Sequence, residues 1–384
     1  MNDKKLLSIV IPTRNREYYC IEAIKSILRF QEDCFELVVQ DNSDSNEVQE
    51  FVSSLNDNRL IYNQTIGRIN FVVNIDKALS LATGEYVIMI GDDDTVSQRI
   101  FELVQWAKDN NIEAVTPKRQ VQYYWPDSLQ LDNNGVVYIS SKYTYKYNSY
   151  NGENQVIEML KGGIINYSGY NLPKVYHGIM KRTILDEIKN RTGRFIGGLS
   201  PDIYLAVAAA LLCEKYYVVD FSFTIAGACP QSATAESLRG GHRGDLNTAP
   251  HLYNRADYEW DKLIPKLYTV ETIWAESALT ALRDMNNAEL CRFFNSGYFF
   301  AGLLWHNLSM RTYILRKIKE TSLGNNKRMH TLISFFYFVT KSIAIRFIRF
   351  FLPNNVKKIS NVSDISNAYD VSESYLKTFL NKKI

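Results

Sequence analysis

The chain has 384 residues, of which 46% are hydrophobic, 22% charged and 13% aromatic, which excludes a disordered protein and allows two packed cores. A net charge of +3, from 44 basic and 41 acidic residues, gives no reason to expect a nucleic-acid partner. The charge is uneven, because residues 1–310 carry −7 and residues 311–384 carry +10. The basic excess therefore belongs to the C-terminal part.

The five cysteines are widely spaced and form no C-x-x-C pair. This spacing excludes a disulfide framework and the usual zinc knuckles, and it favours reduced thiols in the cytoplasm. The apolar run at residues 6–11 is too short for the core of a signal peptide, and no uncharged apolar stretch reaches 18 residues. We therefore expect neither a signal peptide nor a membrane-spanning helix.

The N-terminal third alternates strands with helices. A short apolar run at 6–11 stops at Pro12, and a segment with helical periodicity follows at about 18–30. The same order recurs with strands at 36–39, 60–62, 85–90 and 114–116, and with helices at 46–55, 69–82 and 98–110. The alternation predicts an α/β fold: a Rossmann-like, mostly parallel sheet with helices on both faces.

Polar residues follow three of the predicted strands, at residues 13–15, 41–43 and 91–94. Open parallel sheets bind ligands beyond the carboxyl ends of their strands. We therefore expect these three segments to meet at one crevice.

The most informative segment is the acidic triplet Asp92, Asp93 and Asp94, which directly follows an apolar strand. Three adjacent carboxylates are costly there unless a cation or hydrogen-bond donors offset them. A Mg²⁺ or Mn²⁺ ion bridging carboxylate and diphosphate would do so. Capping of the following helix explains one or two of the acids. Because no P-loop or dinucleotide fingerprint follows the first strand, we expect the metal to hold the phosphates.

Two further strand-end residues suit a nucleobase. Asp41 could accept a hydrogen bond from a base N–H, and the guanidinium of Arg14 could stack on a base. An Asx turn at Asp41 and a solvated loop charge at Arg14 are the structural alternatives.

Four segments together resemble the ordered signature of the inverting glycosyltransferases of family 2, which have the GT-A fold. They are residues 9–16, 37–43, 84–88 and 91–94, in the family's order and spacing within roughly residues 5–120. The resemblance implies a nucleotide-diphosphate sugar as the donor, with a UDP-sugar as the first candidate. It also implies a Mn²⁺ or Mg²⁺ ion and transfer of the sugar to an acceptor hydroxyl.

By position, the resemblance implies that Pro12, Thr13 and Arg14 line the base pocket. It implies that Asp41 binds the base and that Asp92 lies on the ribose side. Arg14 stands where the family often has an aromatic residue, which leaves the identity of the base open.

The same resemblance implies that Asp93 binds the metal, with Asp94 as a further ligand. Gly91 stands where many members carry the first aspartate of a D-x-D motif, which leaves the assignment within the triplet open. Arg68 and Asn70 are weaker donor-site residues, and the polarity of a helix start explains them equally well.

Inverting transfer needs one general base, which the family usually carries in a short motif before a helix. Asp202 matches that place, since it follows a Gly-Gly pair and Pro201 and precedes an apolar helical run at 203–212. The usual preceding glutamate is replaced by Pro201. A purely capping role at the helix start is the alternative.

Residues 163–182 and 229–244 are expected to form the acceptor side and a lid. The second segment is polar and glycine-rich and is suited to closing over a diphosphate. His242 in this loop could be a further metal ligand or merely a solvated histidine.

Beyond about residue 255 the pattern becomes helical and aromatic. The stretch 331–352 is apolar but carries Lys341, Arg346 and Arg349 within an arc of roughly 140°. Residues 321–363 contain seven basic residues and no acid, which is typical of a helix lying on an anionic membrane surface. A helical tail packed on the catalytic domain, or a homodimer contact, is the alternative.

We therefore predict a catalytic domain at 1–250, with a nucleotide-sugar half at 1–120 and an acceptor half at 121–250. A basic helical region at 251–384 would follow it. The expected function is metal-dependent, inverting transfer to a polyprenyl-diphosphate-linked oligosaccharide in capsule or O-antigen synthesis. The enzyme would lie on the cytoplasmic face of the cell membrane.

Two other classes compete with this reading. A sugar-phosphate nucleotidyltransferase would ordinarily show a glycine-rich basic loop after its first strand. A membrane-surface carbohydrate-binding or scaffold protein with a degenerate transferase fold would have no need of Asp92, Asp93 and Asp202 together.

Overall fold

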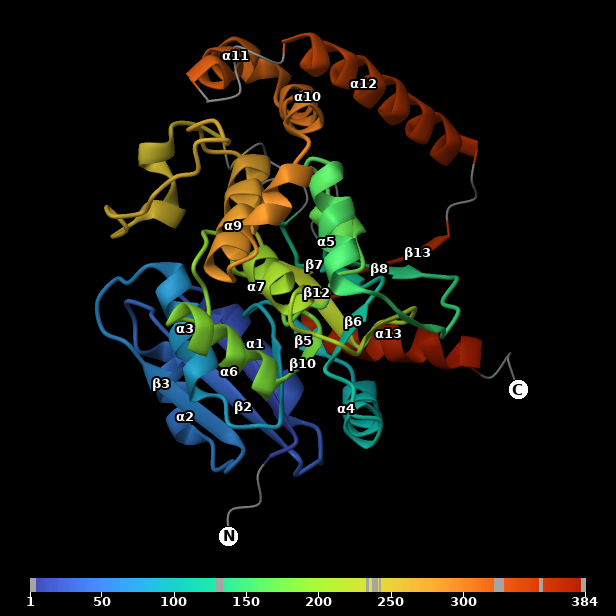
Figure 1. The fold of residues 1–384 in the computed structure, drawn as a ribbon. Coiled ribbons are helices and arrows are strands. Elements are labelled where there is room, and N and C mark those ends of the chain that lie inside the picture. Colours follow the sequence, from blue (N-terminus) through green and yellow to red (C-terminus); the bar gives the residue numbers. More distant parts are fainter. Residues whose placement is uncertain are drawn as a thin grey trace.

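The computed structural model describes residues 5–128, 134–232, 235–236, 241, 243–320, 328–351 and 355–380 (Figure 1). Eight strands of the described chain form the main sheet: β1 (Leu7–Thr13), β2 (Phe35–Asp41), β3 (Leu60–Gln64), β4 (Tyr86–Met89), β6 (Ala114–Pro117), β9 (Tyr147–Ser149), β10 (Ile179–Lys181) and β11 (Tyr216–Val219). Their order across the sheet is β3-β2-β1-β4-β10-β6-β11-β9.

The N-terminal strands are buried on both faces. Ile9 and Ile11 of β1 pack in one core with Ile24 of helix α1 (Glu17–Leu28), whereas Val10 belongs to a second core that contains Ala78 of helix α3 (Phe71–Leu81). This follows from the alternation of side chains along a strand. The predicted mostly parallel α/β sheet with helices on both faces is confirmed.

The register of these strands brings the polar segments to one edge. β1 pairs in parallel with β2 and with β4, and Thr13 lies level with Asp41. The carboxyl ends of the three strands therefore open on the same side of the sheet.

One strand departs from the expected alternation. β10 lies between β4 and β6 and runs antiparallel to both. It has three residues, too few to show a periodicity, and its partners are distant in sequence. The strand at 114–116 is therefore not adjacent to β4 and lies inside the sheet, between β10 and β11.

A second sheet contains five strands of the described residues, in the order β13-β8-β7-β12-β5. Its strands are β5 (Thr95–Val96), β7 (Val121–Tyr124), β8 (Val136–Ser140), β12 (Thr224–Ala228) and β13 (Val356–Ser360). β12 runs beside the acidic triplet, which it contacts through Gly227.

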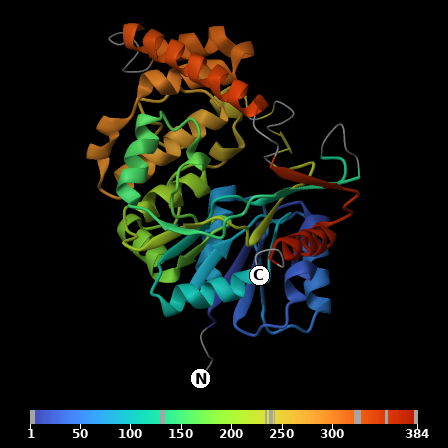
Figure 2. The same ribbon diagram turned by 90° about the vertical axis from the view of Figure 1, so that its right-hand side faces the viewer.

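The C-terminal part returns to the N-terminal core. β13 pairs antiparallel with β8, and helix α13 (Ile365–Leu380) packs on α1, with an Arg29–Asp370 ion pair of 2.8 Å. Figure 2 shows α13 beside the N-terminal elements and far from α12. Residues 356–380 thus belong to the same body as the sheets, not to a separate helical region.

Helices enclose the sheets and extend away from them. The remaining helices are α2 (Glu47–Ser54), α4 (Arg99–Asp109), α5 (Gly152–Lys161), α6 (Arg182–Thr192), α7 (Pro201–Ala210), α9 (Val270–Asp284), α10 (Ser296–His306), α11 (Arg311–Glu320) and α12 (Arg328–Phe351). α7 is almost wholly buried and packs against α9. In Figure 1, α10, α11 and α12 lie at the end of the molecule opposite the N-terminus. Among the described residues, no helix has the length and apolar character needed to cross a bilayer.

Candidate active site

A cavity of about 640 Å³ lies between the carboxyl ends of β1 and β4 and the first turns of α7 and α9. Five residues singled out from the sequence line it together: Pro12, Thr13, Arg14, Asp92 and Asp202. Its volume is that of a typical small-molecule site. Residues that are up to 190 positions apart in the chain thus share one space.

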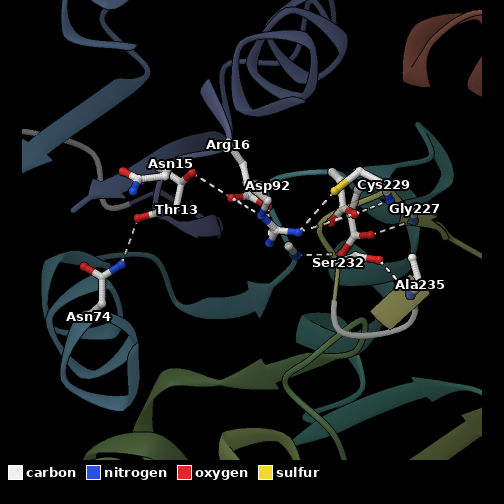
Figure 3. A network of polar contacts seen from close by, with 12 residues as sticks. Thr13, Asn15, Arg16, Asn74, Asp92, Gly227, Cys229, Ser232 and Ala235 are labelled. Atoms are coloured by element: carbon white, nitrogen blue, oxygen red, sulfur yellow. Dashed lines mark hydrogen bonds and ion pairs between the residues drawn. The ribbon is translucent and has the colours of Figure 1, made fainter. Parts of the chain in front are cut away.

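The acidic turn after β4 is held by groups from β1 and its loop. Asp92 is fully buried, and its Oδ2 accepts hydrogen bonds from Thr13 Oγ1 at 2.6 Å and Arg16 Nε at 3.1 Å. Arg16 Nη2 also forms an ion pair with Asp92 Oδ1, and Arg16 Nη1 lies 3.6 Å from Asp93 Oδ2. Figure 3 shows Arg16 between Asp92 and Cys229. Arg16 therefore neutralises part of the buried negative charge.

The charges at this turn depend on each other. Burial raises the pKa of Asp92 and of Asp93, and the neighbouring carboxylates add to the effect, whereas Arg16 opposes it. Burial would lower the pKa of Arg16, but Asp92 and Asp93 raise it well above its usual range. Arg16 supplies one positive charge against the two carboxylates of Asp92 and Asp93, so a further cation at this turn would favour their ionised forms.

The second sheet determines the path of the turn. The N–H of Cys229, just after β12, donates to Asp93 Oδ2 at 2.8 Å, and Trp125 Nε1 donates to the carbonyl oxygen of Asp93 at 3.0 Å. A Cβ at Gly227 would lie 1.8 Å from that carbonyl oxygen. Glycine is therefore required at 227 for the close approach of β12.

Asp94 makes contacts within the protein and is not among the residues that line the cavity. Its carboxylate accepts from the N–H of Gly91 and of Gly227, each at 2.6 Å, and lies 3.1 Å from His177 Nε2. Although burial opposes ionisation, His177 and these backbone groups lower the pKa of Asp94 below its ordinary value. In this structure Asp94 joins β4 to β12, and its metal-binding role stays a prediction.

The side chains at the acidic turn supply only some of the ligands that a divalent ion needs. Within the described residues, no group of three or more His, Cys, Asp or Glu side chains could hold a metal by itself. Asp92 Oδ1, however, is buried and has no hydrogen-bond donor, only the Arg16 ion pair. Mg²⁺ and Mn²⁺ sites commonly use one or two carboxylates and take their other oxygens from substrate and water. Asp92 meets that requirement, whereas Asp93 is not among the residues that line the cavity and its Oδ2 already accepts from the N–H of Cys229. The metal-binding role of Asp93 therefore stays a prediction, and His242 lies outside the described residues.

Asp41 is at the end of β2 and is not among the residues that line the cavity. It is fully buried, and it accepts from the N–H of Ser43 at 2.7 Å and from Tyr62 Oη at 2.9 Å. The Asx-turn geometry left open by the sequence is therefore present. Arg14, which lines the cavity, donates to Asn42 Oδ1 at 2.8 Å in the same strand-end loop.

Arg68 and Asn70 position a neighbouring loop. Asn70 caps α3 by accepting from the N–H of Val72 at 2.8 Å, and its amide donates to the carbonyl oxygens of His251 and Tyr253. The guanidinium of Arg68 lies 3.9 Å from the centroid of the Tyr253 ring. Because His251 lines the cavity, both residues act on the site through this loop and not by lining it.

Asp202 lies in the first turn of α7 and enters the cavity from there. Its two carboxylate oxygens accept hydrogen bonds from Ser200 Oγ and from Tyr167 Oη. The Ser277 hydroxyl of α9 in turn accepts from the N–H of Leu199 at 3.0 Å and of Ser200 at 2.8 Å. Two helices and a distant loop thus fix the orientation of one carboxylate.

Three residues at the site were not singled out by the sequence reasoning, although Tyr167 lies in the segment 163–182 that was expected on the acceptor side. Arg16 stands in the segment that carries the resemblance, and the need to neutralise a buried acidic triplet was a signal for it. Tyr167 and Trp274 gave no local signal, because their rings meet only in the fold, with centroids 5.0 Å apart.

The family described as "Glycosyl transferase family 2" matches residues 8–167. These residues are a family 2 glycosyltransferase domain. The family 2 domain contains the strand ends, Arg16 and the acidic turn, and it reaches Tyr167. Asp202 lies beyond the matched residues.

One relative is the "Putative colanic acid biosynthesis glycosyl transferase WcaA" of Escherichia coli (strain K12). It is 35% identical over 96 residues, which are 24% of this chain and 34% of that protein. The chain thus matches about a third of the length of this relative.

Solved structures of S. aureus TarS are similar at low identity. TarS 1-349 is 16% identical, with 97% of this chain and 92% of that chain covered and a TM-score of 0.46. TarS 1-349 in complex with UDP-GlcNAc has the same identity and coverage, with a TM-score of 0.45.

Proposed function

We propose that the protein transfers a sugar from a nucleotide-diphosphate sugar to an acceptor hydroxyl. A UDP-sugar is the donor that we propose. The observation that carries the proposal is that Asp92 of the acidic turn and Asp202 of α7 line the same cavity. The family 2 domain at residues 8–167 supports a glycosyl transfer.

The strand ends would bind the donor. Pro12, Thr13 and Arg14 would contact the nucleoside, and Asp41 would support that loop through Ser43, whose hydroxyl accepts from the N–H of Asn15. Asp92 and Asp93 would hold a Mn²⁺ or Mg²⁺ ion, which when bound stabilises the negative charge of the leaving diphosphate.

Asp202 would act as the general base. Its carboxylate would accept the proton of the acceptor hydroxyl as that oxygen attacks C1 of the donor sugar and the bond to the diphosphate breaks. Ser200 and Tyr167 hold the two carboxylate oxygens in place, which is the preorganisation that proton transfer requires. Among the described residues that line the cavity, the only carboxylates are Asp202 and Asp92, which we assign to the metal. No carboxylate is left to act as a nucleophile, so a single displacement with inversion at C1 is the outcome we propose.

The acceptor would be a lipid-linked oligosaccharide of a surface polysaccharide, and the protein would lie on the cytoplasmic face of a membrane. This is supported by α12, where Lys341 accompanies the exposed apolar residues Ile333, Phe336, Tyr337 and Ile343. Such a helix suits an anionic lipid surface. The side chains of Arg346 and Arg349, and residues 321–327 and 352–354, lie outside what the structure describes.

Isothermal titration with UDP in the presence and absence of Mn²⁺ tests the donor site. We expect binding that depends on the metal and that is lost in Asp92→Asn. Binding of equal strength without metal would contradict the metal part of the proposal, and no nucleotide binding in either condition would contradict the donor site itself. A panel of nucleotide sugars, ranked by thermal stabilisation with Mn²⁺, would then identify the sugar.

A further inference from the structure

Lys174 is a charged residue near the catalytic cavity that the proposed mechanism does not use. It lies in the loop between the short 3₁₀ helix Tyr167–Gly169 and β10. The residue is only partly exposed, and within the described residues its ammonium forms neither a hydrogen bond nor an ion pair. A lysine charge that is withdrawn from water is costly unless another charge compensates it. The surroundings of Lys174 should therefore contain that charge.

The main sheet holds the backbone of this lysine in place. The N–H of Lys174 donates to Thr116 Oγ1 of β6 at 2.9 Å. The carbonyl oxygen of Val175 accepts from the N–H of Met89 at the end of β4, and the N–H of His177 donates to the carbonyl oxygen of Met89, each at 2.9 Å. Met89 itself lines the catalytic cavity. The segment that carries Lys174 is therefore fixed to the sheet beside the site.

The side chain of Lys174 lies against Tyr167. Its Nζ atom is 5.3 Å from the centroid of the Tyr167 ring, which is within the range of a cation–π contact. The hydroxyl of the same ring donates to Asp202 Oδ2. Burial lowers the pKa of Lys174, and the negative charge of Asp202 opposes that shift. The ammonium of Lys174 and the carboxylate of Asp202 therefore attract each other, and the Tyr167 ring contacts both.

The other groups around Asp202 are uncharged. Tyr167 and Tyr176 face its carboxylate, and burial raises the pKa of each well above its usual range, so both are neutral. From the side of α9 come Trp274, which lines the cavity, and Ser277, which cannot ionise in this range. The remaining titratable side chains that line the cavity are those of Arg14, Arg16, Asp92, His251 and Tyr268.

Both arginines of the cavity already have carboxylate partners. Arg16 forms its ion pair with Asp92, and Arg14 Nη2 lies 3.3 Å from Asp44 Oδ2. Asp202 forms no ion pair with any residue that the structure describes. In this part of the chain, Lys174 is therefore the cation that acts on Asp202 from its own side of the cavity.

We propose that Lys174 is a positioning residue for the transfer reaction: its charge keeps the Asp202 carboxylate ionised, and the Tyr167 ring, which contacts both, sets their separation. A nearby cation favours the ionised form of a carboxyl group, and only that form can accept a proton. When the acceptor hydroxyl gives its proton to Asp202, the acid becomes neutral and Lys174 stays charged. The charge of Lys174 then favours release of that proton to water before the next turnover. The inference rests on the proposed function, in which Asp202 is the base.

The first test does not depend on catalysis. It is a cycle of thermal unfolding with Lys174→Met, Asp202→Asn and the variant that carries both changes. Methionine retains most of the length of the lysine stem, so the fold should tolerate it. We expect Asp202→Asn to lower Tm more in the parent protein than in Lys174→Met, because only in the parent protein does it leave an ammonium without its carboxylate. An equal change in both backgrounds would overturn the proposal.

The second test is the pH dependence of donor hydrolysis, in which water replaces the acceptor hydroxyl. It uses the full-length protein, saturating Mn²⁺ and the nucleotide sugar that stabilises the protein most. In Lys174→Met the low-pH limb should move to higher pH by about one unit, because the carboxyl group loses the cation that favours its ionised form. Lys174→Arg keeps the charge and should restore the limb.

Lys189→Met is the matched control for the pH profile. Lys189 Nζ on α6 also lies over an aromatic ring, 4.7 Å from the centroid of Phe195, but neither residue lines the cavity. Its removal should leave the limb in place. A purely structural role for Lys174 would lower the rate at every pH without moving the limb, and that result would overturn the proposal.

The two tests together separate this inference from the proposed function. If the parent protein neither binds UDP nor hydrolyses the donor, while the effect of Asp202→Asn on Tm still depends on Lys174, the pairing of the two residues stands and the transferase proposal fails. If the donor is hydrolysed with the same low-pH limb in the parent protein and in Lys174→Met, the transferase proposal stands and Lys174 does not act on the base.

Discussion

The two walls of the catalytic cavity are built in different ways. The wall that we propose for the donor, the donor wall, consists of residues 12–14, 16 and 89–92, at the ends of two adjacent parallel strands. The wall that we propose for the acceptor, the acceptor wall, consists of residues 200–202, 268, 270, 273 and 274, which depend on the packing of α7 against α9. The order of the strands is enough to position the residues of the donor wall. The residues of the acceptor wall are positioned only when the helices pack together.

The largest effect is expected on the acceptor wall, at the proposed base. Asp202→Asn keeps the shape and the Ser200 contact but cannot take up a proton, so transfer should fall by about 10² to 10⁴-fold. UDP binding should stay as in the parent protein, because the donor wall is untouched. Both are measured on one preparation, by sugar transfer and by titration. If Asp202→Asn turned over substrate within a factor of two of the parent protein, Asp202 would not be the general base.

Two arginines of one loop test the donor wall. Arg16→Met leaves two buried carboxylates without their cation and should lower the free energy of unfolding by about 3 kcal/mol. Arg14→Met is the control, because its ion pair with Asp44 is largely exposed, and should cost less than about 1 kcal/mol. Denaturant unfolding measures both. Similar losses in the two variants would show that Arg16 does not hold the acidic turn together.

A smaller effect is expected from the group that orients the base. Tyr167→Phe removes one hydrogen bond to Asp202, and kcat should fall about tenfold with the donor KM unchanged. Ser168→Ala, on the same turn but exposed, should leave both values as they are. A change in the donor KM without a change in kcat would contradict a positioning role for Tyr167.

These walls also differ in how far the sequence predicted them. Thr13, Arg14 and Asp92 were placed correctly at one edge of the sheet, because strand periodicity and parallel pairing bring polar strand ends together. Asp202 was placed at a helix start by its local neighbours. Tyr167 and Trp274 could not be found in this way, since nothing within ten residues of either indicates what it contacts. The antiparallel insertion of β10 and the return of β13 to β8 were missed for the same reason.

The smallest effect concerns a buried acid of α9 behind the acceptor wall. Burial raises the pKa of Glu276 from 4.5 to about 7, while Tyr258, Arg283 and the N–H of Asp261 oppose the shift. The unfolded chain loses this proton at lower pH than the folded protein does, so Glu276 lowers stability increasingly as pH rises from 4.5 to 7. Glu276→Gln stays neutral, so its Tm relative to the parent protein should be higher at pH 8 than at pH 5. Thermal unfolding at the two pH values checks this, and an equal difference at both would contradict it.

The central claim is that a donor held at the acidic turn faces Asp202 across one cavity. A crystal structure of the protein with UDP and Mn²⁺, with the metal located by its anomalous signal, tests it most directly. The account predicts the metal at Asp92 and Asp93 and the diphosphate in the cavity that Asp202 lines. A metal bound elsewhere, or a diphosphate bound outside that cavity, would contradict the account.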